Sequence, residues 1–266
     1  MSTVIHANPW QALREYTAAR IALGRTGASM PTSELLKFGM AHAQARDAVH
    51  QAFDSEALSE QLVQAGLKTL TVHSAAENRQ QYLCRPDLGR RLSTSSRELL
   101  LAMAGNPADI LLVVGDGLSS KAVHRQAVPL IKALLPYVSQ LGISLAPILL
   151  AHQSRVALGD EAGECLQAKA VAILIGERPG LSSPDSLSVY MTWGPNTRRL
   201  ESERNCISNI RPEGLDYPLA AFKLAWLLEQ SFQRRLSGVL LKDESDNPAL
   251  HGRIKPPLSW LPSRSR

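Results

Sequence analysis

Apolar and polar positions divide the chain into an amphipathic helical beginning and a longer part in which short apolar runs alternate with helices. The dipeptide Asn8-Pro9 combines a capping side chain with a proline suited to the first helical position. Helices are predicted over residues 8–23, 34–53 and 57–65, and glycines follow the first and the third. We therefore expect residues 1–67 to form a helical N-terminal region.

Beyond this region the pattern changes to strands separated by helices. Strands are predicted over residues 69–74, 110–114, 143–150, 169–175 and 188–192, with helices over 93–104, 120–138, 160–168 and 218–235. Such alternation favours parallel pairing with right-handed crossovers. The predicted fold class is α/β, with a Rossmann-like, doubly wound, mostly parallel sheet over residues 68–238. Residues 239–266 are rich in proline, and we expect an irregular tail without its own core, which Trp260 could anchor.

One loop of this pattern stands out as a candidate binding element. The apolar run 171–175 leads directly into Gly176-Glu177-Arg178-Pro179-Gly180, which places a carboxylate and a guanidinium after a buried strand. In an open α/β sheet, ligands bind at the carboxyl ends of the strands. A charged, solvated turn is the alternative interpretation, and the residue types alone leave both open.

Composition narrows the classes of function. The chain has 266 residues, a net charge of +5 and only 5% aromatic residues, and no basic run is interleaved with aromatics. We therefore do not expect nucleic acid as the partner, although a non-catalytic interaction module remains an alternative. There is no apolar stretch of membrane-spanning length and no signal-peptide pattern at the start, so we expect a cytoplasmic protein without a membrane partner.

The sequence offers little catalytic chemistry of its own. Gly115-x-Gly117-x-x-Ser120 follows a strand and precedes a helix, but serine replaces the third glycine of the dinucleotide fingerprint. A stand-alone nucleotide-binding oxidoreductase is therefore only an alternative. Cys206 has no histidine nearby in the sequence to activate it, and the three cysteines show no metal-ligand spacing. We predict no catalytic residue and no metal site within this chain.

Five segments, in this order along the chain, carry a family resemblance. They are Gly24–Gly27 (GRTG), Tyr82–Arg91 (YLCRPDLGRR), Asp116–Ser119 (DGLS), Gly176–Leu181 (GERPGL) and Cys206–Ile210 (CISNI). Together they resemble the small subunit of ethanolamine ammonia-lyase over roughly residues 8–238. Each motif alone is modest, but five in order with compatible spacing are specific.

The resemblance implies a function that the residues alone do not give. Members of this family use adenosylcobalamin to convert ethanolamine to acetaldehyde and ammonia by a radical mechanism. It implies that a large TIM-barrel subunit holds the substrate, that six copies of each subunit assemble, and that the small subunit is Rossmann-like and covers cobalamin at the interface. Carried over by motif, Val156, Glu177 and Cys206 are the residues expected to contact cobalamin, with Cys206 not acting as a nucleophile.

The resemblance also bears on location. Some members carry a long N-terminal extension that helps to direct the enzyme into a bacterial microcompartment. Here the matching region begins almost at Met1. We therefore do not expect this chain to direct encapsulation.

Overall fold

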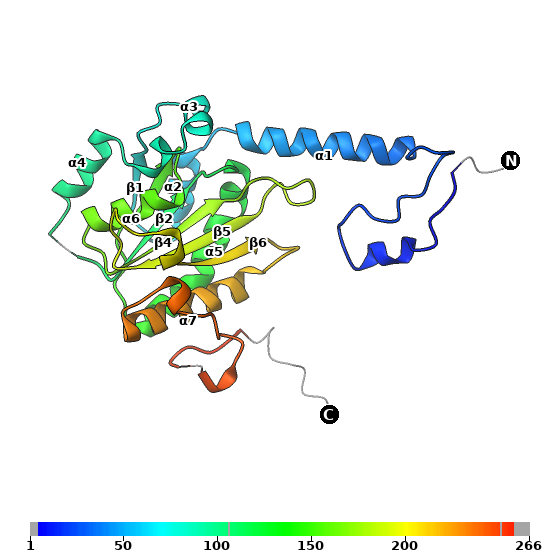
Figure 1. The fold of residues 1–266 in the computed structure, drawn as a ribbon. Helices are drawn as coiled ribbons and strands as arrows, with labels where there is room; N and C mark the ends of the chain where they lie inside the picture. Colours follow the sequence, from blue (N-terminus) through cyan, green and yellow to red (C-terminus); the bar gives the residue numbers. More distant parts are fainter. Residues whose placement is uncertain (1–4, 106, 251, 258–266) are drawn as a thin grey trace.

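The protein is an α/β structure in which helices cover both faces of one sheet (Figure 1). The computed structural model describes residues 5–105, 107–250 and 252–257. The strands are β1 Thr69–His73, β2 Ile110–Gly115, β3 Ile148–His152, β4 Ala170–Gly176, β5 Leu187–Trp193 and β6 Arg204–Ile210. The α-helices are α1 Thr32–His50, α2 Ser55–Gln64, α3 Arg79–Cys84, α4 Thr94–Ala102, α5 Ser120–Leu141, α6 Val156–Cys165 and α7 Tyr217–Arg234. Short 3₁₀ turns lie at Gln11–Glu15, Leu88–Arg90, Glu201–Glu203, Gly238–Leu240 and Pro248–Leu250.

The sheet is mixed rather than mostly parallel. Its strand order is β1-β3-β2-β4-β5-β6, and the first four strands pair in parallel. β5 pairs antiparallel to β4, and β6 pairs antiparallel to β5. A parallel crossover needs about a dozen residues and usually a helix, whereas residues 177–186 join β4 to β5 without one. The α/β class is confirmed, but the mostly parallel, doubly wound sheet is not.

Strand β6 is the element that the hydrophobic pattern does not reveal. Ile207 pairs with Val189, and Ile210 pairs with Leu187, so two residues of β6 lie opposite one residue of β5. A β-bulge of this kind interrupts the alternation by which strands are recognised. Asn209 lies within the bulge and has a φ of 58°. The segment reads as polar because only one of its sides packs on the protein core.

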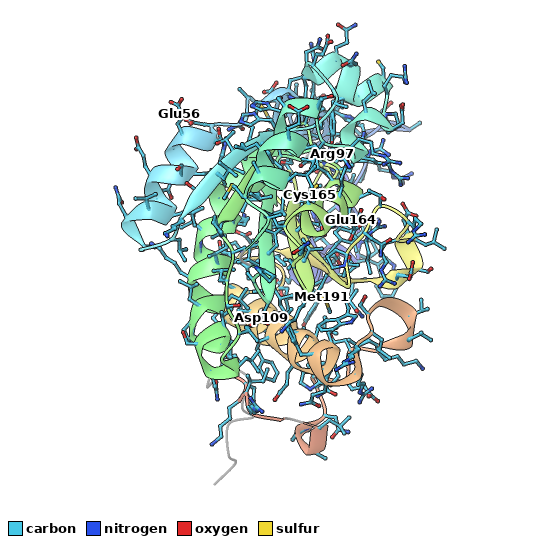
Figure 2. All side chains as sticks on the ribbon, turned by 90° about the vertical axis from the view of Figure 1, so that its left-hand side faces the viewer. Glu56, Arg97, Asp109, Glu164, Cys165 and Met191 are labelled. Carbon is cyan, nitrogen blue, oxygen red and sulfur yellow. The ribbon has the colours of Figure 1, made fainter. Side chains whose placement is uncertain are left out.

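Two apolar layers hold the helices against the sheet. β2 and β4 are buried along their whole length, as expected for central strands covered on both faces. On one face the core joins the sheet to α2, α5 and α7, and on the other it joins the sheet to α4 and α6. Figure 2 labels one residue of each layer, Met191 of β5 and Cys165 of α6. Cys165 is buried, so its thiol fills space in the core.

The N-terminal segment extends away from the sheet (Figure 1). The helix predicted over residues 8–23 is wrong: a single 3₁₀ turn forms at Gln11–Glu15, and none of its residues is buried. A short helix without a packed face is marginal in water, and Ala22 and Gly24 adopt positive φ angles of 52° and 77°. α1 follows as a long helix whose connection to α2 leads back to the sheet, where α2 contributes Leu58 and Leu62 to the core.

The C-terminal segment lies against the body instead of forming a core of its own. Leu241 and Ile254 are buried in the layer of α5 and α7. The Trp226 indole donates a hydrogen bond to the Leu250 carbonyl at 3.1 Å. The predicted anchor, Trp260, lies outside the described residues. Across the part of the chain that the structure describes, no helix is long and apolar enough to cross a membrane.

Candidate functional site

Glu177 lies immediately after β4, at the carboxyl edge of the sheet, as predicted. Its Oε1 atom accepts a hydrogen bond from the Ser188 hydroxyl at the start of β5. The same oxygen accepts a second hydrogen bond from the Asn209 backbone N–H, at 2.8 Å. Both described hydrogen bonds use Oε1, so the Glu177 side chain is fixed while its Oε2 remains available to a ligand.

The β6 bulge supplies the second of these hydrogen bonds. Because Asn209 adopts a left-handed conformation, its N–H points to Glu177 instead of continuing the ladder with β5. The Asn209 carbonyl accepts a hydrogen bond from Leu215 N at 2.8 Å, which fixes the bulge from the other side. The irregularity that hides β6 in the sequence therefore orients the candidate ligand-binding carboxylate.

Val156 is the first residue of α6 and faces a surface pocket. The pocket has a volume of about 260 Å³ and includes Arg155, Val156 and Tyr190 in its lining. Val156 and Tyr190 also each pack against the apolar layer under α6. Strand β5 thus brings an aromatic side chain beside Val156, a neighbour that the sequence did not predict.

Cys206 lies opposite Tyr190 in the β5–β6 ladder and is exposed. Packing around its sulfur and the nearby negative charge of Glu177 raise the pKa of the Cys206 thiol. Partial burial and the neighbouring Cys206 and Glu177 raise the pKa of Tyr190 to about 12. Both groups are therefore protonated near neutral pH, which makes Cys206 a poor nucleophile.

Val156, Glu177, Tyr190 and Cys206 together form one surface, which we call the hairpin face. Tyr190 joins its parts, because it shares the pocket with Val156, pairs with Cys206 and lies in the electric field of Glu177. The structure therefore brings the three predicted site residues into one neighbourhood. Sequence reasoning missed Tyr190 and the two residues that orient Glu177, Ser188 and Asn209. The predicted strand at 188–192 contained a usable signal, since alternation places Ser188 and Tyr190 on the same side.

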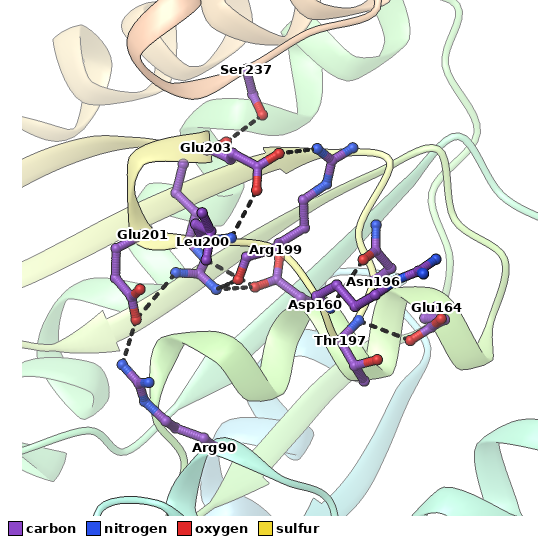
Figure 3. A network of polar contacts seen from close by, with 12 residues as sticks. Arg90, Asp160, Glu164, Asn196, Thr197, Arg199, Leu200, Glu201, Glu203 and Ser237 are labelled. Atoms are coloured by element: carbon purple, nitrogen blue, oxygen red, sulfur yellow. Dashed lines mark hydrogen bonds and ion pairs between the residues drawn. The ribbon is translucent and has the colours of Figure 1, made fainter.

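A network of ion pairs borders the hairpin face (Figure 3). Arg204 of β6 and Asp160 of α6 form a buried pair, with 2.7 Å between Nη2 and Oδ2 and side chains only 3% exposed. Arg204 also faces Glu201, which pairs with Arg90. Burial raises the pKa of Asp160 even though Arg204 opposes that shift. This network fixes β6 to α6 and thereby holds the two sides of the pocket together.

The usual ligand crevice of such a sheet is closed. It would lie between β2 and β3, because these neighbours lead to helices α5 and α6 on opposite faces. Asp116 occupies this position, and its carboxylate accepts hydrogen bonds from Gln153 N at 3.0 Å and Ser154 N at 2.8 Å. The backbone loop beside it is equally tight: a Cβ placed on Gly117 would lie 2.3 Å from the Gly176 carbonyl oxygen.

The start of α5 is capped by the protein's own groups. Ser119 caps the helix by accepting a hydrogen bond from Ala122 N at 3.2 Å, as its residue type predicts. The Ser119 hydroxyl in turn donates to the Pro184 carbonyl at 2.9 Å. Side chains and loops of the protein thus fill the position that a dinucleotide would need, which argues against the stand-alone oxidoreductase.

Comparison with known proteins agrees with the motifs. Residues 7–242 match the family described as the ethanolamine ammonia-lyase light chain. The chain is 55% identical over 244 residues to the ethanolamine ammonia-lyase small subunit of Xanthomonas campestris pv. campestris, covering 91% of this chain and 90% of that protein. It is 56% identical over 246 residues to the small subunit of Ralstonia nicotianae, covering 91% of each chain. The small subunit of Azotobacter vinelandii is 53% identical over 257 residues, covering 96% of this chain and 95% of its own. The chain therefore belongs to the family of ethanolamine ammonia-lyase small subunits.

Proposed function

We propose that this chain covers adenosylcobalamin in an ethanolamine ammonia-lyase that converts ethanolamine to acetaldehyde and ammonia. The observation that carries the proposal is the pre-oriented Glu177 carboxylate on the hairpin face, next to the exposed Cys206 and the half-buried Tyr190. Family membership supports the lyase role. When bound, adenosylcobalamin supplies the radical chemistry of the reaction.

The residues of the hairpin face fit the rim of a corrin. Such a rim carries primary amide side chains around a large apolar ring, so its partners should include a hydrogen-bond acceptor and apolar contacts. The Oε2 atom of Glu177 provides the acceptor, and a hydrogen bond to a charged group contributes about 1.5–3 kcal/mol. Val156 and Tyr190 provide apolar surface. Cys206, with its raised pKa, provides a neutral thiol contact and no nucleophile.

The role of this chain is therefore to bind and shield the cofactor rather than to move protons of the substrate. We propose that the large TIM-barrel subunit holds ethanolamine and that six copies of each subunit assemble in the cytoplasm. A solvent-exposed site on one subunit becomes closed to water when its partner covers it, and water exclusion protects reactive species from side reactions.

The N-terminal segment is the proposed docking surface for the large subunit. Trp10 is 68% exposed and Tyr16 is 85% exposed, and Leu36 and Met40 of α1 are also largely exposed. Exposed apolar groups gathered in one part of a chain mark an interaction surface. Arg20 donates a hydrogen bond to the Leu181 carbonyl at 3.1 Å, which connects this segment to the loop that begins at Glu177. Docking there would bring the partner next to the hairpin face.

An ammonia-release assay with ethanolamine and adenosylcobalamin tests the proposal. We would compare this chain alone, the large subunit alone and the two co-expressed. Activity only in the co-expressed sample is the expected result. A properly assembled complex that binds adenosylcobalamin but releases no ammonia would overturn the substrate assignment, and one that binds no adenosylcobalamin would overturn the cofactor assignment.

A further inference from the structure

The turn that precedes Val156 adopts an unusual conformation, and one buried carboxylate holds it. Gln153 has a φ of 54°, a left-handed conformation that residues other than glycine adopt at a cost. Asp116 is 1% exposed, and its two carboxylate oxygens accept the N–H groups of Gln153 and Ser154, at 3.0 Å and 2.8 Å. The bidentate contact ties both amides of the turn to the end of β2.

The remaining backbone groups of the turn bind a second remote segment. The Tyr82 hydroxyl donates to the Ser154 carbonyl at 3.1 Å, and Arg155 N donates to the Gly89 carbonyl at 2.7 Å. Gly89 has no room for a side chain, because a Cβ there would lie 2.9 Å from both Tyr82 and Arg155. Tyr82 and Gly89 both belong to the Tyr82–Arg91 motif, and Asp116 begins the Asp116–Ser119 motif. These two motifs, which had no assigned role, therefore meet at this turn.

Two arginines complete the arrangement around Tyr82. The guanidinium of Arg79 lies 4.8 Å from the Tyr82 ring centre, and that of Arg155 lies 4.4 Å from it. Arg79 Nη1 is also 3.3 Å from the Asp116 carboxylate and donates to the Gly117 carbonyl at 2.8 Å. The charge of Asp116 is thus partly balanced, and the cation–π contacts restrict both arginines.

The backbone N–H groups of the turn have hydrogen-bond partners, but several polar side-chain atoms around it have none in the described part of the chain. Four buried polar atoms have no hydrogen-bond partner among the described residues: Arg79 Nη2, Gln153 Oε1, Ser154 Oγ and Arg155 Nε. Each such atom costs free energy, as does the left-handed backbone. Costs of this kind concentrate where a fixed geometry is needed. The residue that follows this turn is Val156, the start of α6 and part of the hairpin face.

We propose that Asp116 and Tyr82 are positioning residues that fix the 153–155 turn and thereby aim Arg155 and Val156 into the pocket shared with Tyr190. The proposal rests on the proposed function, in which this pocket belongs to the cofactor-binding surface. Asp116 and Tyr82 act through the turn and do not touch the ligand themselves. Their loss should weaken cofactor binding without removing any contact residue.

The hold of Asp116 on the turn should depend on pH. Burial raises the pKa of Asp116 to about 6, while the Arg79 charge and the two amide hydrogen bonds oppose that shift. The ionisable groups around the carboxylate are Arg79 and Tyr82 on α3 and Arg155 before α6. A proton on the carboxyl removes one of its acceptor positions and its charge. The turn should therefore be firmly held above about pH 6 and loosened below it.

The test uses the assembled complex of both subunits and follows adenosylcobalamin binding by absorbance titration between pH 5.5 and 8. The wild-type affinity should fall several-fold as the pH is lowered through about 6. D116N should bind roughly tenfold more weakly at pH 8, with a flat pH profile, because loss of a charged hydrogen-bond acceptor has an effect of that size. The matched control is D246N, which makes the same change at an exposed aspartate that pairs with Lys223 of α7. It should behave as wild type.

Y82F provides an independent variant that keeps the ring between the two arginines and removes only the hydroxyl donor. It should weaken binding about three- to tenfold, whereas Y137F, which removes a hydroxyl bonded to Lys255 on the far side of the sheet, should not. Trypsin should cleave after Arg155 faster in both D116N and Y82F. If D116N does not assemble, Y82F alone decides the question.

The possible failures are distinguishable. A wild-type complex that binds no adenosylcobalamin at any pH would overturn the proposed function. A wild-type complex that binds it, with D116N and Y82F binding equally tightly and with the same pH profile, would overturn the positioning role alone.

Discussion

Two neighbouring regions at the same edge of the sheet each hold an oriented carboxylate, but only one of them leaves a carboxylate oxygen free for a ligand. Between β2 and β3, Asp116 fills the crevice where α/β sheets usually bind ligands, and its hydrogen bonds all go to the protein. Beyond β4, Glu177 is equally well oriented but keeps one carboxylate oxygen free beside an exposed thiol and a half-exposed phenol ring. One carboxylate therefore organises the structure and the other is available to a ligand.

This difference explains why a dinucleotide-like sequence need not bind a dinucleotide. Gly117 and Gly176 allow close approach of backbone to backbone, and Gly115 leaves room for the Ser154 side chain, so the approaching group is in each case the protein itself. The binding surface that we propose lies beyond β4 instead, around the antiparallel strands β5 and β6. A variant that fills the closed region should consequently lower stability, whereas a variant that changes the free carboxylate should lower cofactor affinity.

The largest expected effect is the loss of stability when a side chain is added in the closed region, where the end of β4 meets the β2–α5 loop. A Cβ at Gly176 would lie 2.1 Å from the Ser119 carbonyl oxygen and 2.8 Å from the Asp116 carbonyl oxygen, and neither backbone atom can move freely. We expect G176A to lower the free energy of unfolding by about 3 kcal/mol or more. Thermal unfolding and soluble yield of the co-expressed subunits measure this change.

Gly39 provides the control for that variant. It lies on α1, and nothing lies within 4 Å of the position that an alanine methyl group would take there, so G39A should stabilise the helix by up to about 1 kcal/mol. Equal stability of G176A and wild type would contradict the tight contact between the β2–α5 loop and the end of β4.

The next largest effect is a loss of cofactor affinity when the Glu177 carboxylate is neutralised. E177Q keeps an acceptor for Ser188 and Asn209 but loses the charge, so adenosylcobalamin affinity of the complex should fall by about 2 kcal/mol, roughly 30-fold. The free energy of unfolding should change little, because Glu177 is only partly buried. Titration of the complex measures the affinity, and the exposed Glu213, changed to Gln, is the control. Unchanged affinity in E177Q would remove Glu177 from the cofactor surface.

A smaller effect should follow when Glu177 loses one of its supports. S188A removes the hydroxyl that donates to Oε1 and leaves the Asn209 N–H in place. One hydrogen bond contributes about 1 kcal/mol, so we expect affinity to fall about fivefold. S139A, on the exposed side of α5, should have no effect. A loss as large as that of E177Q would mean that Ser188 itself contacts the ligand.

The sequence was informative where local patterns decide the structure. The buried strand before Glu177 and the turn after it follow from an apolar run and from Gly and Pro, and both were predicted. The β6 strand was not, because its bulge at Asn209 breaks the alternation. The helix over 8–23 was predicted wrongly, since none of the residues of the turn that forms there, Gln11–Glu15, is buried against the described part of the chain.

The geometry of the site depends on contacts between distant segments. Neither the inward position of Asp116 nor its contact with Arg79 is visible in a Gly-x-Gly pattern, because the groups involved are 37 residues apart. Tyr190 was likewise missed, although the strand that carries it was predicted. The pattern predicted where Glu177 would lie but not which side chains would surround it.

Alkylation of Cys206 in the assembled complex tests most directly whether adenosylcobalamin occupies the hairpin face. Because the thiol has a raised pKa, labelling should be measured near pH 9, with the exposed Cys84 as internal reference. Addition of adenosylcobalamin should slow labelling of Cys206 at least tenfold and leave Cys84 unchanged. Equal labelling of Cys206 with and without the cofactor would contradict the account.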